Sequence, residues 1–291
     1  MFLFIYILVG LILGPSLLKI ELPEVIFSIA SLGFLFIAGL ELNISRLQED
    51  LKASVKIALG AFALPFVVGF AYAMSGLGRD AEGAVVIAVA LAISALPVVV
   101  QILKDLKMYE TRLGHTIIAA ATICDITAWL IFSCLLPAGD RDRWFMSHLP
   151  VLFFFIGLVF APWLSRKEKV LRGFMVSSKY FFAPIFFIGV GMKIHLQENF
   201  DLLQCLTILL LAVVAKMIGV YASARWVSIA KSEAKIIAMV LNARGAMEIL
   251  FCAMALKLGL IDGHLFTSLT VMAVVSSLMA APLVKLSKRR S

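Results

Sequence analysis

Apolar stretches of about twenty residues follow one another along almost the whole chain, and this repetition limits the folds that it can adopt. A helix that crosses a bilayer needs roughly 20 predominantly apolar residues. Hydrophobic residues make up 62% of the 291 residues and charged residues only 15%, a balance that excludes an ordinary soluble domain. We therefore predict an all-α polytopic membrane protein with ten transmembrane helices. The candidate spans cover residues 1–17, 25–42, 55–74, 83–103, 114–137, 149–164, 179–193, 202–223, 234–257 and 264–285.

The ends and connections of these spans contain no sign of a soluble domain. The first run, "MFLFIYILVGLILG", lacks the basic start and the small-residue cleavage site of a signal peptide, so we read it as part of a span. The longest polar connection is predicted between Ser165 and Lys179.

Lysine and arginine residues are distributed unevenly over the connections. With ten spans the connections alternate between two faces, and one face carries 18 of these residues while the other carries six. By the positive-inside rule the richer face is cytoplasmic. Both termini of this chain are then expected in the cytoplasm, and the protein in the inner or plasma membrane. The net charge of +8 reflects topology and attraction to anionic lipid, with no nucleic-acid partner expected.

Four charged residues fall deep inside predicted spans: Asp125, Lys216, Arg244 and Glu248. Such charges are costly, face the interior of the bundle and usually mark an ion or proton path. Arg244 and Glu248 are spaced i, i+4, so they could instead neutralise each other as a static ion pair. Asp125 has no basic residue within one turn of its own span. Its partner must therefore come from another helix, or its carboxyl group must be protonated.

Two of the predicted spans are interrupted near their centres. Pro97 lies in the middle of "VALAISALPVVVQIL", where it removes a backbone hydrogen bond. Asn242, Arg244 and Gly245 lie in the middle of "VLNARGAMEIL". Helix breaks at membrane depth are tolerated where protein or a water-filled cavity satisfies the freed groups. Paired broken spans in the two halves of a chain indicate the midplane site of a secondary transporter.

Other functional classes have less support in the sequence. The four cysteines, Cys124, Cys134, Cys205 and Cys252, lie in apolar runs without metal-ligand spacing, which favours buried packing thiols. The four histidines are scattered near span ends, so no enzymatic cluster is predicted and no cofactor is expected. A cation channel would share this composition, but the chain contains no filter-like repeat.

Six stretches of the sequence carry a family resemblance. They are "GLILGPSLL" (10–18), "LGFLFIAGLELN" (32–43), "SALPVVVQILKDLKMYETRLGHTIIAAATICDITAW" (94–129), "APIFFIGVGMKI" (183–194), "AKMIGVYASARW" (215–226) and "NARGAMEIL" (242–250). In these stretches and in their order the chain resembles the monovalent cation:proton antiporter-2 family, and the long central stretch is most similar to the branch with the plant exchangers. The resemblance implies secondary active exchange of Na⁺ or K⁺ for H⁺.

The resemblance also implies a fold and a set of site residues. The family fold is an inverted repeat in which two broken helices, here 83–103 and 234–257, cross near the midplane. The expected ion- and proton-binding residues are Asp125, Cys124, Thr122 and Ser94, with Asp125 as the cation ligand. Lys216, Arg244 and Glu248 are the expected charge-pairing residues, and Pro97, Asn242 and Gly245 the expected helix breaks. Members often have an acid two residues after the arginine, where this chain has Ala246.

The chain is shorter than the family pattern. Members have about thirteen spans, and the resemblance implies that the first helix and two central helices are missing from a single exchanger domain over residues 1–291. Loss of two helices preserves the alternation of the later spans. The missing helices belong to the panel and dimer side of the fold, where the resemblance places the interface of the expected homodimer. A non-transporting remnant, or a subunit of a larger assembly, is therefore the alternative reading.

The pair Cys124-Asp125 departs from the family in its charge. Electrogenic members have Asp-Asp at this site and others Asn-Asp, so this chain keeps one carboxylate. A buried thiol stays neutral and cannot replace the first carboxylate. We therefore expect one proton to be exchanged for one monovalent cation, which is electroneutral. We also expect Lys216 to pair with Asp125 in the cation-free state and to be displaced when the cation binds.

Overall fold

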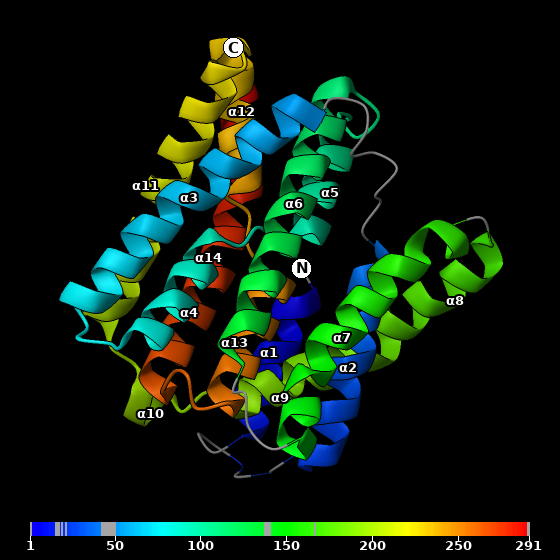
Figure 1. Cartoon of the computed structure of the whole chain (residues 1–291), viewed down its shortest axis with the longest axis vertical. Helices are drawn as coiled ribbons and strands as arrows, with labels where there is room; N and C mark the ends of the chain where they lie inside the picture. The colour runs from blue at the N-terminus through cyan, green and yellow to red at the C-terminus, as the bar shows by residue number, and fades with distance from the viewer. Residues whose placement is uncertain are drawn as a thin grey trace. The chain divides into compact units, whose positions relative to one another are not determined.

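The computed structural model is built entirely from helices in the part of the chain that it describes, residues 2–14, 18, 20, 22–41, 51–136, 141–165 and 167–289 (Figure 1). In chain order the helices are α1 (Phe2–Leu13), α2 (Glu24–Glu41), α3 (Leu51–Ser75), α4 (Ala81–Ala92), α5 (Leu96–Asp105), α6 (Arg112–Leu135), α7 (Arg141–Leu164), α8 (Glu168–Ser177), the π-helix η2 (Ser178–Phe182), α9 (Ala183–Met192), α10 (Leu196–Asn199), α11 (Leu202–Trp226), α12 (Lys231–Leu241), α13 (Ala246–Lys257) and α14 (Gly263–Arg289). Four of the lysine and arginine residues counted for the two membrane faces lie outside the part of the chain that the structure describes: Lys19, Arg46, Arg166 and Arg290.

Many of these helices are long and apolar enough to cross a membrane. Among the described residues 6 helices qualify, and up to 7 spans result if α12 and α13, which are bent by 41° at their break, count as one. Shorter apolar stretches cover His148–Leu164 and Gly263–Met279. The all-α prediction is therefore confirmed, whereas ten transmembrane helices stay a prediction.

The predicted polar connection between Ser165 and Lys179 is wrong for most of its length. Residues Glu168–Ser177 form α8, which continues through η2 into α9. Apolar residues in this segment recur at helical spacing, as at Val170 and Phe174, so the segment forms an amphipathic helix despite its charges.

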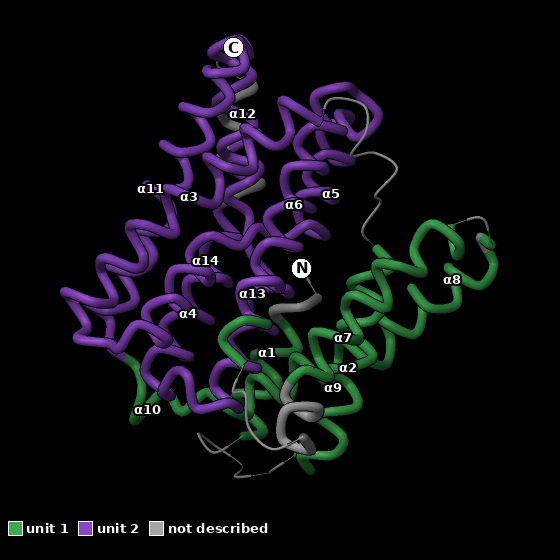
Figure 2. Tube along the Cα trace, in the orientation of Figure 1, with its two compact units in different colours: residues 1–45, 133–200 green, residues 46–132, 201–291 purple. Residues whose placement is uncertain are grey.

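The chain divides into two compact units that are each assembled from two separate segments (Figure 2). Unit 1 comprises residues 1–45 and 133–200, and unit 2 comprises residues 46–132 and 201–291. Unit 1 thus contains α1, α2 and α7 to α10, and unit 2 contains α3 to α6 and α11 to α14.

Close backbone packing holds the helices of unit 1 together. At the α2–α7 contact, a Cβ atom added to Gly39 would lie 2.1 Å from the carbonyl oxygen of Phe154, and one added to Gly157 would lie 2.0 Å from that of Phe36. Small residues at such crossings let backbones approach closely, which is the usual way in which helices pack in membranes. A stack of Phe27, Phe34 and Phe186 side chains adds apolar contact.

Unit 2 is built around α4, which is enclosed because most of its side chains are small. In α4 the residues Val86 to Ala92 are completely buried. The α3–α11 pair uses the same device as unit 1, since a Cβ atom at Gly219 would lie 2.1 Å from the carbonyl oxygen of Gly60. This tight packing leaves α4 with no access to solvent along its second half, so the polar groups at its end depend on protein partners.

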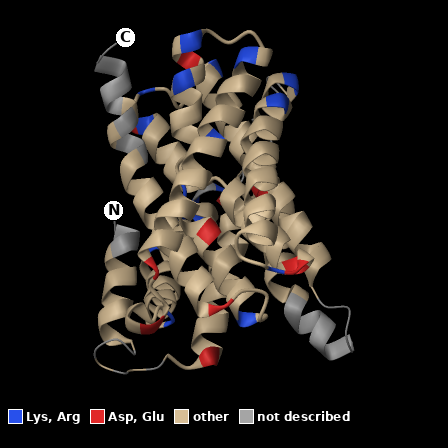
Figure 3. Ribbon diagram, turned by 90° about the vertical axis from the view of Figure 1, so that its left-hand side faces the viewer, with Lys and Arg blue, Asp and Glu red and all other residues tan. Residues whose placement is uncertain are grey.

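The two ends of unit 2 differ in charge. Lysine and arginine residues gather where α3 and α12 begin (Figure 3). At the other end, Arg79 before α4 pairs with Asp262 before α14. Burial of Asp262 opposes its ionisation, but hydrogen bonds from the Leu265 N–H group and from Arg79 outweigh this effect and lower the pKa of the carboxyl group. The pair is therefore intact at neutral pH and is lost only as the pH falls through that lowered pKa.

Candidate functional site

Both predicted interruptions are present in unit 2. The first separates α4, which ends at Ala92, from α5, which begins at Leu96 with Pro97 in its first turn. Proline has no N–H group to donate and is favoured in the first turn of a helix, so α5 starts directly before Pro97 and the break precedes it. The second separates α12, which ends at Leu241, from α13, which begins at Ala246.

The two interruptions contact each other through their backbones. The N–H group of Ala95 donates to the carbonyl of Ala243 at 3.0 Å, and the Ser94 hydroxyl donates to the carbonyl of Leu241, also at 3.0 Å. A Cβ atom at Gly245 would lie 3.3 Å from the Cβ atom of Ala95. Glycine therefore permits the close approach of the two breaks, and groups freed by one break find partners in the other.

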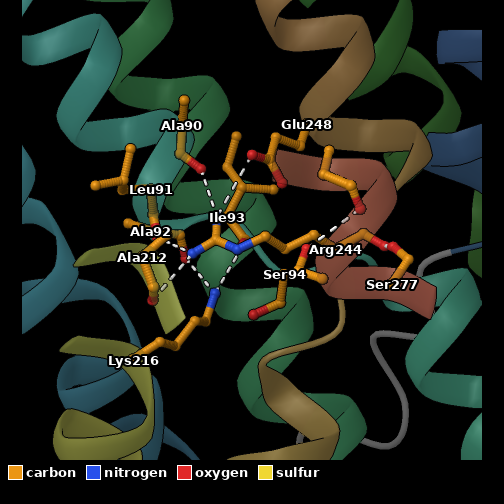
Figure 4. A network of polar contacts seen from close by, with 12 residues as sticks. Ala90, Leu91, Ala92, Ile93, Ser94, Ala212, Lys216, Arg244, Glu248 and Ser277 are labelled. Carbon is orange, nitrogen blue, oxygen red and sulfur yellow. Dashed lines mark hydrogen bonds and ion pairs between the residues drawn. The ribbon is translucent and has the colours of Figure 1, made fainter. Parts of the chain in front are cut away.

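The end of α4 is capped by two buried cations (Figure 4). A helix leaves its last four carbonyls without partners in the helix, and in α4 these belong to Ala90, Leu91, Ala92 and Ile93. Arg244 donates to the first two, at 2.8 Å in the case of Ala90. Lys216 donates to the last two at 2.6 Å each. Since the negative end of the helix dipole lies at the same place, hydrogen bonding and electrostatics both favour cations there.

Arg244 makes further contacts that fix it inside unit 2. Its side chain is completely buried, and Nη2 also lies 3.4 Å from the carbonyl oxygen of Ala212 in α11. The Ser277 hydroxyl of α14 donates to the backbone carbonyl of Arg244. Arg244 thus joins the α12–α13 break to α4, α11 and α14.

The expected ion pair between Lys216 and Asp125 is absent from the structure. Among the described residues neither carboxyl oxygen of Asp125 has a hydrogen-bond partner, and the Lys216 ammonium group binds the carbonyls of Ala92 and Ile93 instead. The pattern of charges alone favours an ion pair, but the break in α4 supplies backbone acceptors in the place that Lys216 reaches. Lys216 still interacts electrostatically with Asp125.

Asp125 lies in α6 and only 1% of it is exposed. Its neighbour Cys124 is buried too, with Sγ directed at the carbonyl of Ala58 in α3, 3.7 Å away. Thr122 donates to the carbonyl of Ile118 in its own helix at 2.9 Å. Of these three candidate residues in α6, Asp125 is the one whose polar side-chain atoms make no hydrogen bond within the described part of the chain.

Glu248 lies in the first turn of α13 and is completely buried. Its Oε1 atom lies 3.5 Å from Nη1 of Arg244, which is an ion pair at i, i+4 spacing. Among the described residues neither Glu248 oxygen accepts a hydrogen bond, and the Asn242 side-chain oxygen also has no donor. The predicted ion pair is therefore formed at 3.5 Å, without a hydrogen bond, while the guanidinium group donates its hydrogen bonds to backbone carbonyls.

The sequence does not predict three parts of this site: the free carbonyls at the end of α4, the Ala212 carbonyl and the Ser277 hydroxyl. Pro97 predicts that carbonyls are freed one turn earlier, but nothing in the sequence shows which cations bind them. Ser277 is a small residue in an apolar helix, and such residues are common at helix contacts without further function.

Two broken helices that contact each other at their breaks, with buried carboxyl groups and cations beside them, are typical of secondary transporters. The transmembrane sodium/hydrogen exchanger family matches residues 3–167 and 144–286. The chain belongs to this family of monovalent cation:proton antiporters, whose members are integral membrane transporters and not enzymes.

Individual relatives match over most of the chain. The Na⁺/H⁺ antiporter NhaS4 of Synechocystis sp. is 24% identical over 363 residues, covering 96% of this chain and 88% of the relative. The Na⁺/H⁺-K⁺ antiporter GerN of Bacillus cereus is 24% identical over 342 residues, with the same coverage of 96% and 88%. The structure of the sodium proton antiporter MjNhaP1 from Methanocaldococcus jannaschii matches with a TM-score of 0.65 and 13% identity, covering 98% of this chain and 90% of that chain. At this identity the structural match shows the fold alone.

Proposed function

We propose that this chain exchanges a monovalent cation, Na⁺ or K⁺, for H⁺ across a membrane, with Asp125 as the residue that carries either ion. The observation behind this proposal is a buried carboxyl group whose oxygens accept no hydrogen bond from the described residues, in a unit where Lys216 and Arg244 are bound to backbone carbonyls. The names of relatives include both Na⁺/H⁺ and Na⁺/H⁺-K⁺ antiporters, which supports cation/proton antiport in general.

The chemistry of one carboxyl group gives the exchange. Protonated Asp125 is neutral and can move between access states, whereas the ionised form can coordinate a dehydrated cation. Displacement of Lys216 would free the carbonyls of Ala92 and Ile93 as oxygen ligands, the type that hard cations prefer. Ser94 in the break and Thr122 on α6 complete the proposed set of oxygen ligands, while Cys124 stays neutral. A site that moves only when protonated or loaded couples the two fluxes without a leak.

With Asp125 as the only exchanging group, one proton is expected to move for each cation and no net charge is transferred. Proteoliposomes that contain the full chain should then acidify or alkalinise in response to a Na⁺ gradient at a rate independent of membrane potential. The measurement clamps the potential with potassium and valinomycin while a pH dye reports exchange. A rate that changes several-fold with potential would contradict the one-for-one cycle and implicate Lys216 as a second proton carrier. A complete lack of exchange of either cation would favour the remnant reading.

Replacement of Lys216 by Ala is expected to move the pH dependence of exchange to higher pH and to lower stability. Removal of a positive charge near Asp125 favours the protonated carboxyl group, and the carbonyls of Ala92 and Ile93 lose their donors. Each unsatisfied buried polar group costs about 1–3 kcal/mol. The pH profile of exchange and the unfolding temperature in detergent measure the two effects. Lys56, which is partly exposed and lies 4.7 Å from the Trp226 ring centre, is the matched control, since Lys56→Ala should change neither.

The finer architecture also belongs to this proposal. We place ten spans with an inverted repeat in a single exchanger domain over residues 1–291, with both termini on the cytoplasmic side and a homodimer as the assembly. The uneven basic charge at the ends of unit 2 supports the orientation (Figure 3). The family match is split into two segments that share residues 144–167, which supports the loss of helices from the middle of the family pattern.

A further inference from the structure

A pocket of about 490 Å³ lies at the basic end of unit 2, where α6 and α12 begin and α11 ends. All of its lining residues belong to unit 2, and none of them belongs to the two breaks or to the proposed exchange at Asp125. Its volume is typical of small-molecule sites, which enclose roughly 300–1,000 Å³. The pocket is therefore large enough for a ligand that the exchange reaction does not involve.

The walls of this pocket carry two opposite charges. Arg112 is the first residue of α6, and Glu233 lies in the first turn of α12. A purely anionic ligand would meet the Glu233 carboxylate, and a purely cationic ligand would meet the Arg112 guanidinium. Because like charges at a binding site disfavour the wrong partner, the pocket fits a ligand that carries an anionic and a cationic group.

Polar groups for the anionic part gather around Arg112. The start of α12 receives no side-chain cap from Ala230, which also lines the pocket. The first N–H groups of a helix have no partner within the helix, and phosphate oxygens suit this position. A guanidinium group is likewise a preferred partner of phosphate. Thr116, which lines the pocket and is 5% exposed, donates to the Arg112 carbonyl at 3.0 Å and keeps its hydroxyl oxygen as an acceptor.

The connection between α11 and α12 adds an unusual backbone position. Ser228 lines the pocket with φ 62°, at the turn where the N–H groups of Ser228 and Ile229 bond back to the carbonyls of Arg225 and Ala224. Glycine is the usual residue at such a helix end, because a side chain costs energy there. Serine at this position brings a hydroxyl group to the pocket at that cost.

The neighbouring residues indicate the depth of the pocket in the membrane. Trp226, directly before the lining residue Val227, is 63% exposed, and the Lys56 ammonium group lies 4.7 Å from its ring centre. Exposed tryptophans gather at the boundary between lipid tails and water. Leu113, Val227 and Ile229 add apolar wall to the same pocket. A ligand at this depth with polar and apolar parts is a phospholipid.

We propose that this pocket binds the phosphoethanolamine headgroup of a phospholipid. The phosphate accepts hydrogen bonds from Arg112 and from the first N–H groups of α12, and the ammonium group donates to the Glu233 carboxylate. The bound headgroup joins the start of α6, the helix of Asp125, to the start of α12, the first half of the second broken helix. The site stabilises unit 2 whether or not the chain exchanges cations.

The test measures the unfolding temperature of the purified full chain in detergent micelles with added dioleoyl phosphatidylethanolamine, phosphatidylcholine or phosphatidylglycerol. A ligand that binds only the folded state raises this temperature, and we expect a rise of about 5 °C at saturating phosphatidylethanolamine. Phosphatidylcholine has no N–H group for Glu233, and phosphatidylglycerol has no ammonium group, so both should raise the temperature less.

Two variants separate the two contacts. Arg112→Ala should remove the rise with phosphatidylethanolamine, because the phosphate loses its cation. Glu233→Gln should leave equal rises with phosphatidylethanolamine and phosphatidylglycerol, because the contact with the phosphate remains. Lys235→Ala is the matched control, since Lys235 is an exposed basic residue of α12 that does not line the pocket, and it should respond as wild type does.

Three results would overturn the proposal. Equal rises with all three lipids in wild type would show that the headgroup is not recognised. A rise with phosphatidylethanolamine that survives in Arg112→Ala would place the lipid elsewhere. An equal rise with water-soluble glycerophosphoethanolamine would assign the pocket to a free metabolite instead of a lipid. If Arg112→Ala fails to fold without lipid, the loss of selectivity in Glu233→Gln decides.

Discussion

Asp125→Asn is expected to abolish cation/proton exchange. Asparagine preserves the size of the side chain, but it can neither release a proton nor offer a charged oxygen to Na⁺ or K⁺. Loss of an essential proton-transfer group costs about 100-fold or more, so exchange should fall to the background of protein-free vesicles. The measurement is Na⁺- and K⁺-driven pH change in proteoliposomes, from pH 6 to pH 9 in order to separate loss of activity from a shifted profile.

The stability of this variant gives the second half of the result. In the structure Asp125 is buried and its oxygens have no hydrogen-bond donor among the described residues, so a neutral amide should not weaken the fold. Asp125→Asn should therefore unfold at or above the wild-type temperature, as expected for a residue retained for activity. Near-normal exchange by a well-folded variant would remove Asp125 from the mechanism. Cys134→Ser, which changes an exposed residue of the same helix without removing a charge, is the control and should keep exchanging.

Much of the architecture could be predicted because each membrane-spanning helix needs a long run of apolar residues, which is visible in the sequence. The two broken helices were predictable as well, since Pro97 cannot donate to the preceding turn and since Asn242, Arg244 and Gly245 are out of place in an apolar span. The segment of α8 was not, because its charged residues concealed an amphipathic helix that continues into α9.

The site shows where such reasoning ends. The charges at Asp125, Lys216, Arg244 and Glu248 could be identified one by one, and so could the i, i+4 ion pair of Arg244 with Glu248. The backbone partners of the two cations could not. Lys216 was expected to pair with Asp125, whereas both cations bind the carbonyls at the end of α4. The sequence does not show which backbone carbonyls are left free. These carbonyls compete with carboxylates for a cation only when the fold brings a free helix end to the right place.

Arg244→Ala is expected to produce the largest loss of stability of any variant considered. Truncation removes the donors to the carbonyls of Ala90, Leu91 and Ala212 and leaves Glu248 without its cation. Removal of one partner from a buried ionic network costs about 3–5 kcal/mol, which for a chain of this size lowers the unfolding temperature by on the order of 10 °C. Thermal unfolding of the purified protein in detergent measures the effect, and exchange should be lost because the crossing of the two breaks loosens.

Two further variants separate the capping role from the charge. Arg225→Ala removes an exposed arginine that donates to the Ile229 carbonyl near the surface, and it should change the unfolding temperature little. Arg244→Lys keeps the charge but offers one ammonium group in place of a planar fork of donors. If capping of α4 is what stabilises the crossing, this lysine should recover only part of the loss, because it cannot reach the carbonyls of α4 and α11 together. Full recovery by lysine would show that the charge alone matters, and an unfolding temperature of Arg244→Ala equal to that of wild type would show that the carbonyls at the end of α4 need no cation.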